Sequence, residues 1–166
     1  MNAAASQLGG LTLLVVGLMA FLLLAARLVS PQHAYRRRPL VTGNELEFYM
    51  RLARAYPEGR VFPQVAMAAL IEPAAGSDKA KLSAFRQISQ KRCDYIITNL
   101  RLEVLVVVEL DDSTHDAKLD AQRDRRLTSA GIPTLRWTSR EKPDLAEIRG
   151  TLLHTIDASK SGRAGQ

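Results

Sequence analysis

The chain has 166 residues, enough for one domain with a hydrophobic core and one appendage. Its 46% hydrophobic and 24% charged residues are typical of a folded protein, and the net charge of +6 permits attraction to nucleic acid or anionic lipid without identifying either. The single cysteine, Cys93, excludes an intrachain disulfide, and with three scattered histidines it provides no zinc-finger spacing.

A long uncharged segment lies near the N-terminus. Residues 8–26 contain no charged side chain and, as a helix, would span roughly 28 Å, close to the hydrocarbon thickness of a bilayer. The positive-inside rule places the N-terminus outside and the remainder in the cytoplasm, because basic residues follow this segment and none precedes it. These residues are Arg27, Arg36, Arg37 and Arg38.

We therefore expect a transmembrane anchor at residues 1–28, in contact with the lipid bilayer of the inner membrane through residues 8–26. A basic juxtamembrane linker at residues 29–41 should follow, and its arginines also suit anionic headgroups. A cleaved signal peptide and a buried helix of a soluble domain are the alternative interpretations. A signal peptide requires a positively charged n-region and a shorter apolar core, and this segment has neither.

The next elements are predicted from apolar spacing and capping signals. A helix is expected from Thr42 to about Tyr56, because Thr42 and Glu45 fit a capping box and the apolar residues that follow recur at helical spacing. A short strand over Arg60–Met67 follows, then a loop and a short helix over Lys81–Lys91.

The second half of the chain predicts a hairpin and a crossover. Cys93–Thr98 and Arg101–Leu110 are expected to pair as antiparallel strands. A helix over Asp116–Ala130 and a strand over Thr134–Trp137 should then form a right-handed parallel crossover. A last helix over Pro143–Ile156 completes the order.

Together these elements predict an α/β domain over residues 42–157, with a mixed sheet and helices on both sides, followed by a flexible tail at residues 158–166.

Acidic residues gather where the hairpin strands begin and end. Glu109 and Asp111 leave the end of the apolar strand on the same face, because side chains alternate along a strand. Asp94 begins the preceding strand, and we expect the hairpin to bring it close to Glu109. Carboxylates at the end of a buried strand are costly unless they are paired, hydrated or bound to a cation, and oxygen ligands favour Mg²⁺.

Four segments of this half resemble one known superfamily. They are Cys-Asp-Tyr-Ile-Ile from Cys93, Glu-Leu-Asp-Asp-Ser-Thr-His from Glu109, Asp120 with Arg123 and Asp124, and Ala-Gly-Ile-Pro-Thr-Leu-Arg from Ala130. With the element order, they resemble the PD-(D/E)XK restriction-endonuclease-like superfamily, and within it an uncharacterised bacterial domain-of-unknown-function branch similar to the very-short-patch-repair endonucleases. The resemblance covers about Thr42 to Trp137. It implies a restriction-endonuclease-like αβββαβ core and a nuclease that acts on nucleic acid with Mg²⁺ or Mn²⁺.

The resemblance also implies roles for individual residues. Asp94 and Glu109 match the metal-binding acids, and Glu45 matches an additional acid that many members place beside the metal. Asp111 stands where the superfamily has a lysine, so the usual cation that orients the attacking water is absent. His115 resembles the histidine of the very-short-patch-like branch and would act as acid, base or charge stabiliser.

Several candidates have a purely structural alternative. Glu45 also completes a capping box, and His115 also suits a solvated loop. Asp120, Arg123 and Asp124 also suit an ion-pair face of a helix. Arg136, on the last strand, is expected either to pair with the acids or to meet a phosphate.

Two functional hypotheses follow from these residues. The first is a membrane-anchored, metal-dependent nuclease that faces the cytoplasm, with Asp94, Glu109, Asp111 and His115 as catalytic candidates. The second is a catalytically inactive nuclease-like module that binds nucleic acid or a protein partner at the membrane.

Overall fold

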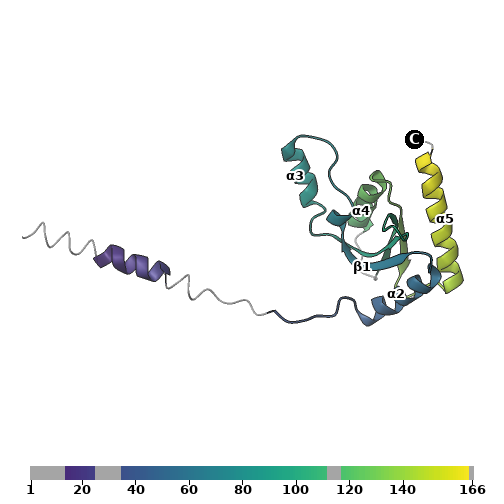
Figure 1. Cartoon of the computed structure of the whole chain (residues 1–166), viewed down its shortest axis with the longest axis horizontal. Helices are drawn as coiled ribbons and strands as arrows, with labels where there is room; N and C mark the ends of the chain where they lie inside the picture. The colour runs from purple at the N-terminus through teal and green to yellow at the C-terminus, as the bar shows by residue number, and fades with distance from the viewer. Residues whose placement is uncertain (1–13, 25–34, 112–116, 165–166) are drawn as a thin grey trace, which may run out of the picture. The chain divides into compact units, whose positions relative to one another are not determined.

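A computed structural model of the chain describes residues 14–24, 35–111 and 117–164 (Figure 1). It divides into two units, Met1–Arg38 and Pro39–Gln166. The described part of the first unit contains a helix at residues 14–24 with exposed side chains, followed further along by an extended segment.

The predicted transmembrane helix is not supported by the described residues. Among residues 14–24, 35–111 and 117–164, no helix is both long and apolar enough to cross a membrane. The remainder of the predicted segment at residues 8–26 lies outside the described residues.

The second unit contains the predicted order of helices and strands, including the short helix between the first two strands and the helix after the last strand. The elements are α2 (Gly43–Ala55), β1 (Arg60–Ala66), the 3-10 turn η1 (Met67–Ala69), α3 (Asp78–Arg86), β2 (Arg92–Thr98), β3 (Val104–Asp111), α4 (Ala117–Ser129), β4 (Thr134–Thr138) and α5 (Leu145–Ala164). The predicted α/β class is therefore confirmed.

The sheet has four strands in the order β1-β2-β3-β4. β1 and β2 are antiparallel, β2 and β3 are antiparallel, and β3 and β4 are parallel, so the sheet is mixed and the predicted crossover is confirmed. In the parallel pair, Glu109 lies opposite Arg136. This register places a cation on β4 beside the acidic end of β3.

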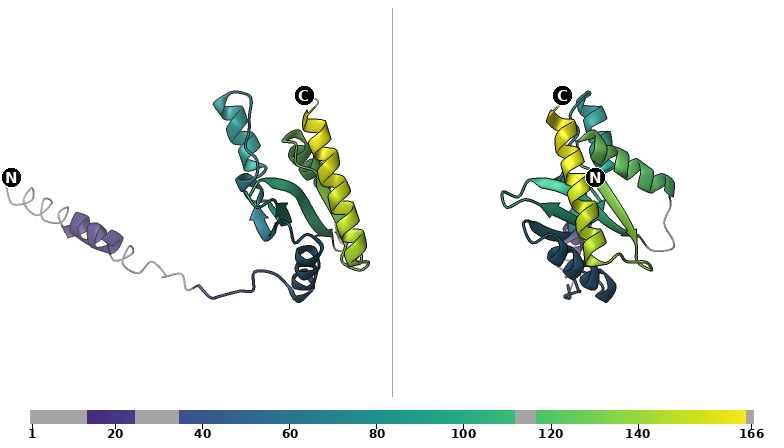
Figure 2. Two further views of the ribbon diagram at one scale, coloured as in Figure 1. Left: turned by 45° about the vertical axis from the view of Figure 1, so that its right-hand side comes forward. Right: turned by 90° about the vertical axis from the view of Figure 1, so that its right-hand side faces the viewer.

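Helices cover both faces of the sheet, as predicted (Figure 2). α2 and α5 pack on one face, where Phe48, Leu52, Ile148 and Leu152 are buried against β2 and β3. α4 packs on the other face through Leu127. α3 buries none of its own side chains. The buried apolar run of β3 therefore has cover on both sides, which is why it carries β-branched residues without alternation.

The capping box that was predicted at Thr42 and Glu45 is present. The backbone N–H of Thr42 donates to Glu45 Oε2 at 2.6 Å, and the backbone N–H of Glu45 donates to Thr42 Oγ1 at 3.3 Å. Two of the backbone donors at the start of α2 are thereby satisfied, and the Glu45 side chain is fixed at the N-terminal end of the helix.

Several predicted boundaries were wrong for local reasons. β3 begins at Val104 rather than Arg101, because Asn99 Oδ1 accepts hydrogen bonds from the backbone N–H groups of Arg101 and Glu103 and so closes a longer turn. α3 begins at Asp78 because Ser77 caps it, accepting from the Ala80 N–H at 3.4 Å.

The predicted flexible tail at residues 158–166 is helical as far as Ala164, the last residue described. Ile156 is the last buried apolar residue of α5. The apolar periodicity that predicted the end of this helix therefore ends at Ile156, whereas the helical backbone continues to Ala164.

Candidate active site

The hairpin brings Asp94 and Glu109 together. Tyr95 on β2 pairs with Val108 on β3, and continuing this register by one residue sets Asp94 opposite Glu109. The backbone N–H of Leu110 donates to Asp94 Oδ2 at 3.0 Å, which holds the Asp94 carboxylate against the end of β3. Glu109 is only 1% exposed. The buried Glu109 and the half-buried Asp94 thus form an acid pair at the C-terminal end of an inner strand.

Burial dominates the electrostatics of this acid pair. It raises the pKa of Glu109 to about 8, and the charge of Asp94 adds to the increase, while the Arg123 and Arg136 cations oppose it. Burial also raises the pKa of Asp94, opposed by the hydrogen bond from the Leu110 N–H. Near neutral pH, Glu109 therefore retains a proton, which it can donate to Asp94.

The buried Oε1 atom of Glu109 has no hydrogen-bond partner among the described residues. If both acids were ionised, no donor would lie between them. A proton on Glu109 removes this repulsion by forming a hydrogen bond to Asp94, and a cation would remove it by binding both carboxylates. The pair is therefore unstable as two bare charges.

Arg123, on α4, is a cation in direct contact with the acid pair. Its Nη2 atom lies 3.1 Å from Glu109 Oε2 and 3.2 Å from Asp120 Oδ1. Its Nε atom is buried and has no described acceptor. The attraction of Arg123 lowers the Glu109 pKa, but burial and Asp94 outweigh it. Sequence reasoning placed Arg123 only among auxiliary candidates, since the spacing from Asp120 does not reveal which acid the arginine reaches.

Asp111 binds Arg136 rather than the Arg123 side chain that contacts the acid pair. Arg136 Nη1 donates to both Asp111 oxygens, at 2.8 and 3.0 Å, and Arg136 Nε and Nη2 donate to the two oxygens of Asp124 at 3.0 and 2.8 Å. The hydrogen bonds that Arg136 donates to Asp124 and to Asp111 raise its pKa. This arrangement joins β3, β4 and α4, and it decides the open question about Arg136: the arginine pairs with acids.

Glu45 and Gln64 border the pair on its other side. Gln64 Nε2 donates to Glu45 Oε1 at 3.3 Å, and the Tyr95 hydroxyl donates to the Glu45 carbonyl at 2.8 Å. The charge of Glu45 contributes to the raised Asp94 pKa. Gln64 has a φ of 56°, a left-handed conformation that is rare for a residue with a side chain. Sequence reasoning missed Gln64, because only its position after Pro63 marks an irregular strand.

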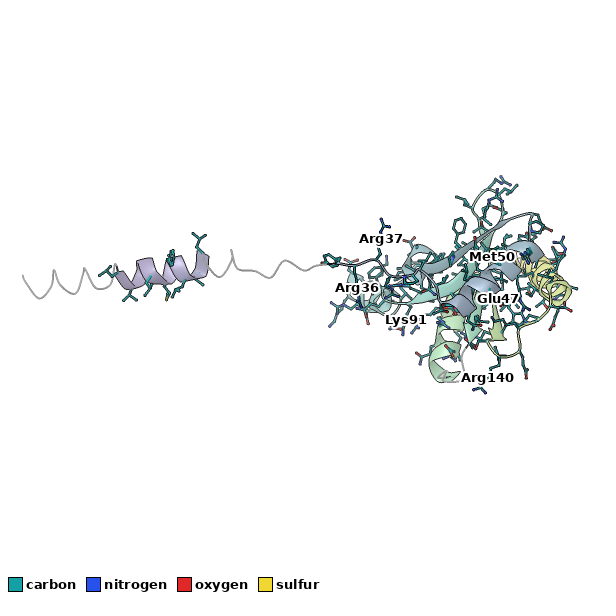
Figure 3. The ribbon with its side chains drawn as sticks, turned by 90° about the horizontal axis from the view of Figure 1, so that it is seen from below. Arg36, Arg37, Glu47, Met50, Lys91 and Arg140 are labelled. Atoms are coloured by element: carbon teal, nitrogen blue, oxygen red, sulfur yellow. The ribbon has the colours of Figure 1, made fainter. Side chains whose placement is uncertain are left out.

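Two predicted residues cannot be placed. His115 and Arg27 lie outside the residues that the structure describes. Arg36, Arg37 and Arg38 are exposed on a segment without regular secondary structure, and Figure 3 labels the first two.

The acid pair fits a cation that takes few protein ligands. No group of three or more His, Cys, Asp and Glu side chains in the described ranges is arranged to hold a metal ion. Mg²⁺, however, is commonly bound by one or two carboxylates and keeps several waters. Asp94 and Glu109 offer two such carboxylates, one of which has the partnerless buried oxygen. The donor set therefore suits Mg²⁺ or Mn²⁺ better than Zn²⁺, which prefers nitrogen and sulfur.

The fold and the site together define a mixed α/β domain that buries a carboxylate pair at the end of an inner strand. The model of the family described as Protein of unknown function (DUF2726) matches residues 37–156. This match covers most of the chain, so the chain belongs to that family, and the expected membership of a domain-of-unknown-function family is confirmed. No curated protein and no solved structure matches the chain.

Proposed function

We propose that this chain is a PD-(D/E)XK-like nuclease that hydrolyses nucleic-acid phosphodiesters with Mg²⁺ or Mn²⁺ at Asp94 and Glu109. The observation that carries the proposal is the acid pair, in which Glu109 is buried and its Oε1 atom has no described partner. The element order and the parallel pairing of β3 with β4 support the resemblance to that superfamily. The position of the pair at the C-terminal end of β3 matches the usual location of ligands in α/β sheets.

The residues around the pair have separable roles in this proposal. When bound, the metal supplies Lewis acidity towards the phosphodiester. The Leu110 N–H orients Asp94, and Asp94 and Glu109 would hold the metal through their carboxylates. Arg123 contributes positive charge from α4, close to Glu109, although the lysine position is occupied by Asp111. Glu45, linked to Gln64, adds negative charge near Asp94.

Membrane anchoring belongs to the same proposal. The uncharged run at residues 8–26, followed by Arg27 and the arginines at 36–38, supports a single-pass protein of the inner membrane with its domain in the cytoplasm. The helix at residues 14–24 exposes large apolar side chains, such as Leu14 and Phe21, which suits a lipid environment.

The second candidate is a catalytically inactive module that binds nucleic acid or a protein partner. One observation favours it: Arg123 already pairs with Glu109, and Arg136 binds Asp111 bidentately. Arg136 thus neutralises Asp111 without any metal, and Arg123 already occupies one oxygen of Glu109. A site of this kind would stabilise the domain rather than perform chemistry.

The test is cleavage by the full chain in detergent of single- and double-stranded DNA and RNA, each with Mg²⁺, Mn²⁺ or chelator. Glu109→Gln and Asp94→Asn should abolish metal-dependent cleavage and leave the fold intact. Glu141→Gln, a matched change at an exposed glutamate, should cleave like the unmodified chain. Absence of metal-dependent cleavage of all four substrates by the folded protein would favour the inactive module. Cleavage that survives Glu109→Gln would exclude this site.

A further inference from the structure

A basic pocket lies next to the acid pair, on the α4 side of the sheet. It has a volume of about 320 Å³ and is lined by Gln87, Lys91, Asp120, Gln122, Arg123 and Arg126. Arg123 belongs to this pocket and also contacts Glu109 Oε2 at 3.1 Å. Arg123 therefore belongs to both this pocket and the proposed catalytic site.

The positive charge of this pocket is only partly neutralised. Arg123 is balanced by Glu109 and Asp120. Lys91 (labelled in Figure 3) and Arg126 form no ion pair within residues 14–24, 35–111 and 117–164. Two cations facing one cavity favour an anionic ligand, and a planar guanidinium beside an ammonium suits phosphate oxygens.

An apolar pocket of about 280 Å³ adjoins the basic one and shares Gln87 and Arg126 with it. Its walls include the aliphatic side chains of Ile71, Pro73 and Ala84. Arg126 Nη2 donates to Gln87 Oε1 at 2.6 Å, which orients the Gln87 amide at the boundary between the two pockets. The size is near the lower end of small-ligand pockets, about 300 Å³, which are mostly apolar with a few placed polar groups.

The two pockets together present the chemistry of one nucleotide. A nucleobase has apolar faces and a polar edge, while its backbone carries a negative phosphate. Aliphatic walls next to an oriented amide suit the base, and the unpaired cations suit the phosphate. A base held in this way cannot remain in a base pair.

We propose that the joined pockets form a nucleotide-binding subsite for an unpaired stretch of the strand to be cleaved. Lys91 and Arg126 hold a backbone phosphate, and the apolar pocket receives the base attached to it. The inference rests on the proposed nuclease function for the position of the scissile phosphate at Asp94 and Glu109. It adds a preference for unpaired over paired strands, shared by DNA and RNA.

The experiment measures binding by the full chain in detergent with chelator, so that cleavage does not enter. The probes are a fluorescent single-stranded 12-mer of DNA, the same 12-mer of RNA, and a DNA duplex of equal length, each at several salt concentrations. Ala84→Leu narrows the apolar pocket, and Lys91→Ala with Arg126→Ala removes the two cations. The matched controls are Ala146→Leu on exposed α5, and Arg54→Ala with Arg101→Ala, which remove two exposed cations elsewhere.

We expect single strands to bind at least about tenfold more tightly than the duplex. Ala84→Leu should weaken single-strand binding about fivefold or more, because the larger side chain fills space that the base would occupy, and leave duplex binding unchanged. The double cation variant should reduce the salt slope for single strands by about 0.7, from loss of the one phosphate that both cations hold. The controls should behave like the unmodified chain. The DNA and RNA arms identify which strand the subsite prefers.

Equal affinity for duplex and single strands, or losses no larger than those of the controls, would overturn the subsite. Circular dichroism of each variant shows that a loss does not reflect unfolding. If cleavage occurs but these variants bind normally, the subsite is wrong and the nuclease proposal stands. If the variants lose binding but no cleavage is found, the subsite stands and the nuclease proposal falls.

Discussion

Replacing Glu109 by glutamine should stabilise the domain above neutral pH. The pKa of Glu109 rises from its ordinary value of 4.5 to about 8 in the folded chain, mainly through burial. Between these two pH values the folded state binds more protons than the unfolded state, so the free energy of unfolding falls as pH rises. The contribution of protonated Glu109 is complete below pH 4.5 and is lost once pH passes 8.

The size of the effect follows from the same pKa values. A difference of about 3.5 at 1.36 kcal/mol per pKa unit gives an upper bound of about 5 kcal/mol. A glutamine keeps the shape of the protonated acid, and its amide can donate to Asp94 at every pH. The free energy of unfolding of Glu109→Gln should therefore not show this fall with rising pH, and the variant should be the more stable protein at pH 9.

Urea unfolding of the full chain in detergent with chelator, from pH 5 to pH 9, measures this difference. Trp137 is the only tryptophan and packs against the core from β4, so its fluorescence reports on the domain. Other groups titrate in both proteins, so the quantity of interest is the free energy of unfolding of the variant minus that of the unmodified chain at each pH. Glu141→Gln should show no pH-dependent difference. A constant difference for Glu109→Gln across this range would refute the raised pKa and the acid pair derived from it.

Three further predictions concern the rest of the domain. Arg136→Ala should cost about 3 kcal/mol in urea unfolding, because it leaves Asp111 and Asp124 without their bidentate partner; a loss below 0.5 kcal/mol would contradict this role. Asp111→Lys should lower stability by about 2 kcal/mol and add no cleavage activity, since the new ammonium would face Arg136; a gain in activity would show that a lysine here reaches the acid pair. Deletion of residues 1–28 should leave a folded domain, because the unit Pro39–Gln166 has its own hydrophobic core. Circular dichroism should show a cooperative unfolding transition for the shortened chain, and loss of this cooperativity would contradict the prediction.

The strands were predictable because their signals are local. The β-branched run of β3 and the spacing of β3, α4 and β4 determine a buried strand and a parallel crossover without knowledge of distant partners. The Ser77 cap of α3 was also a readable signal. The start of β3 was not, since it depends on how the Asn99 side chain folds back on the turn.

The partners of the site residues were not predictable. The proximity of Asp94 and Glu109 follows from the hairpin, but the choice of Arg123 for Glu109 and Arg136 for Asp111 depends on the rotation of α4 and the reach of long side chains. Gln64 enters through a left-handed backbone conformation in β1, which no periodicity reveals. Burial of Glu109, and hence its raised pKa, likewise results from packing between elements that are distant in the chain.

The central claim is that Asp94 and Glu109 bind a divalent cation. Calorimetric titration of the full chain with Mn²⁺ at pH 7, in two buffers of different ionisation enthalpy, tests it by counting protons. With the pKa of Glu109 near 8, binding should release about one proton, and Glu109→Gln should lose both the binding and the release. Binding without proton release, or binding that Glu109→Gln leaves unchanged, would contradict the account.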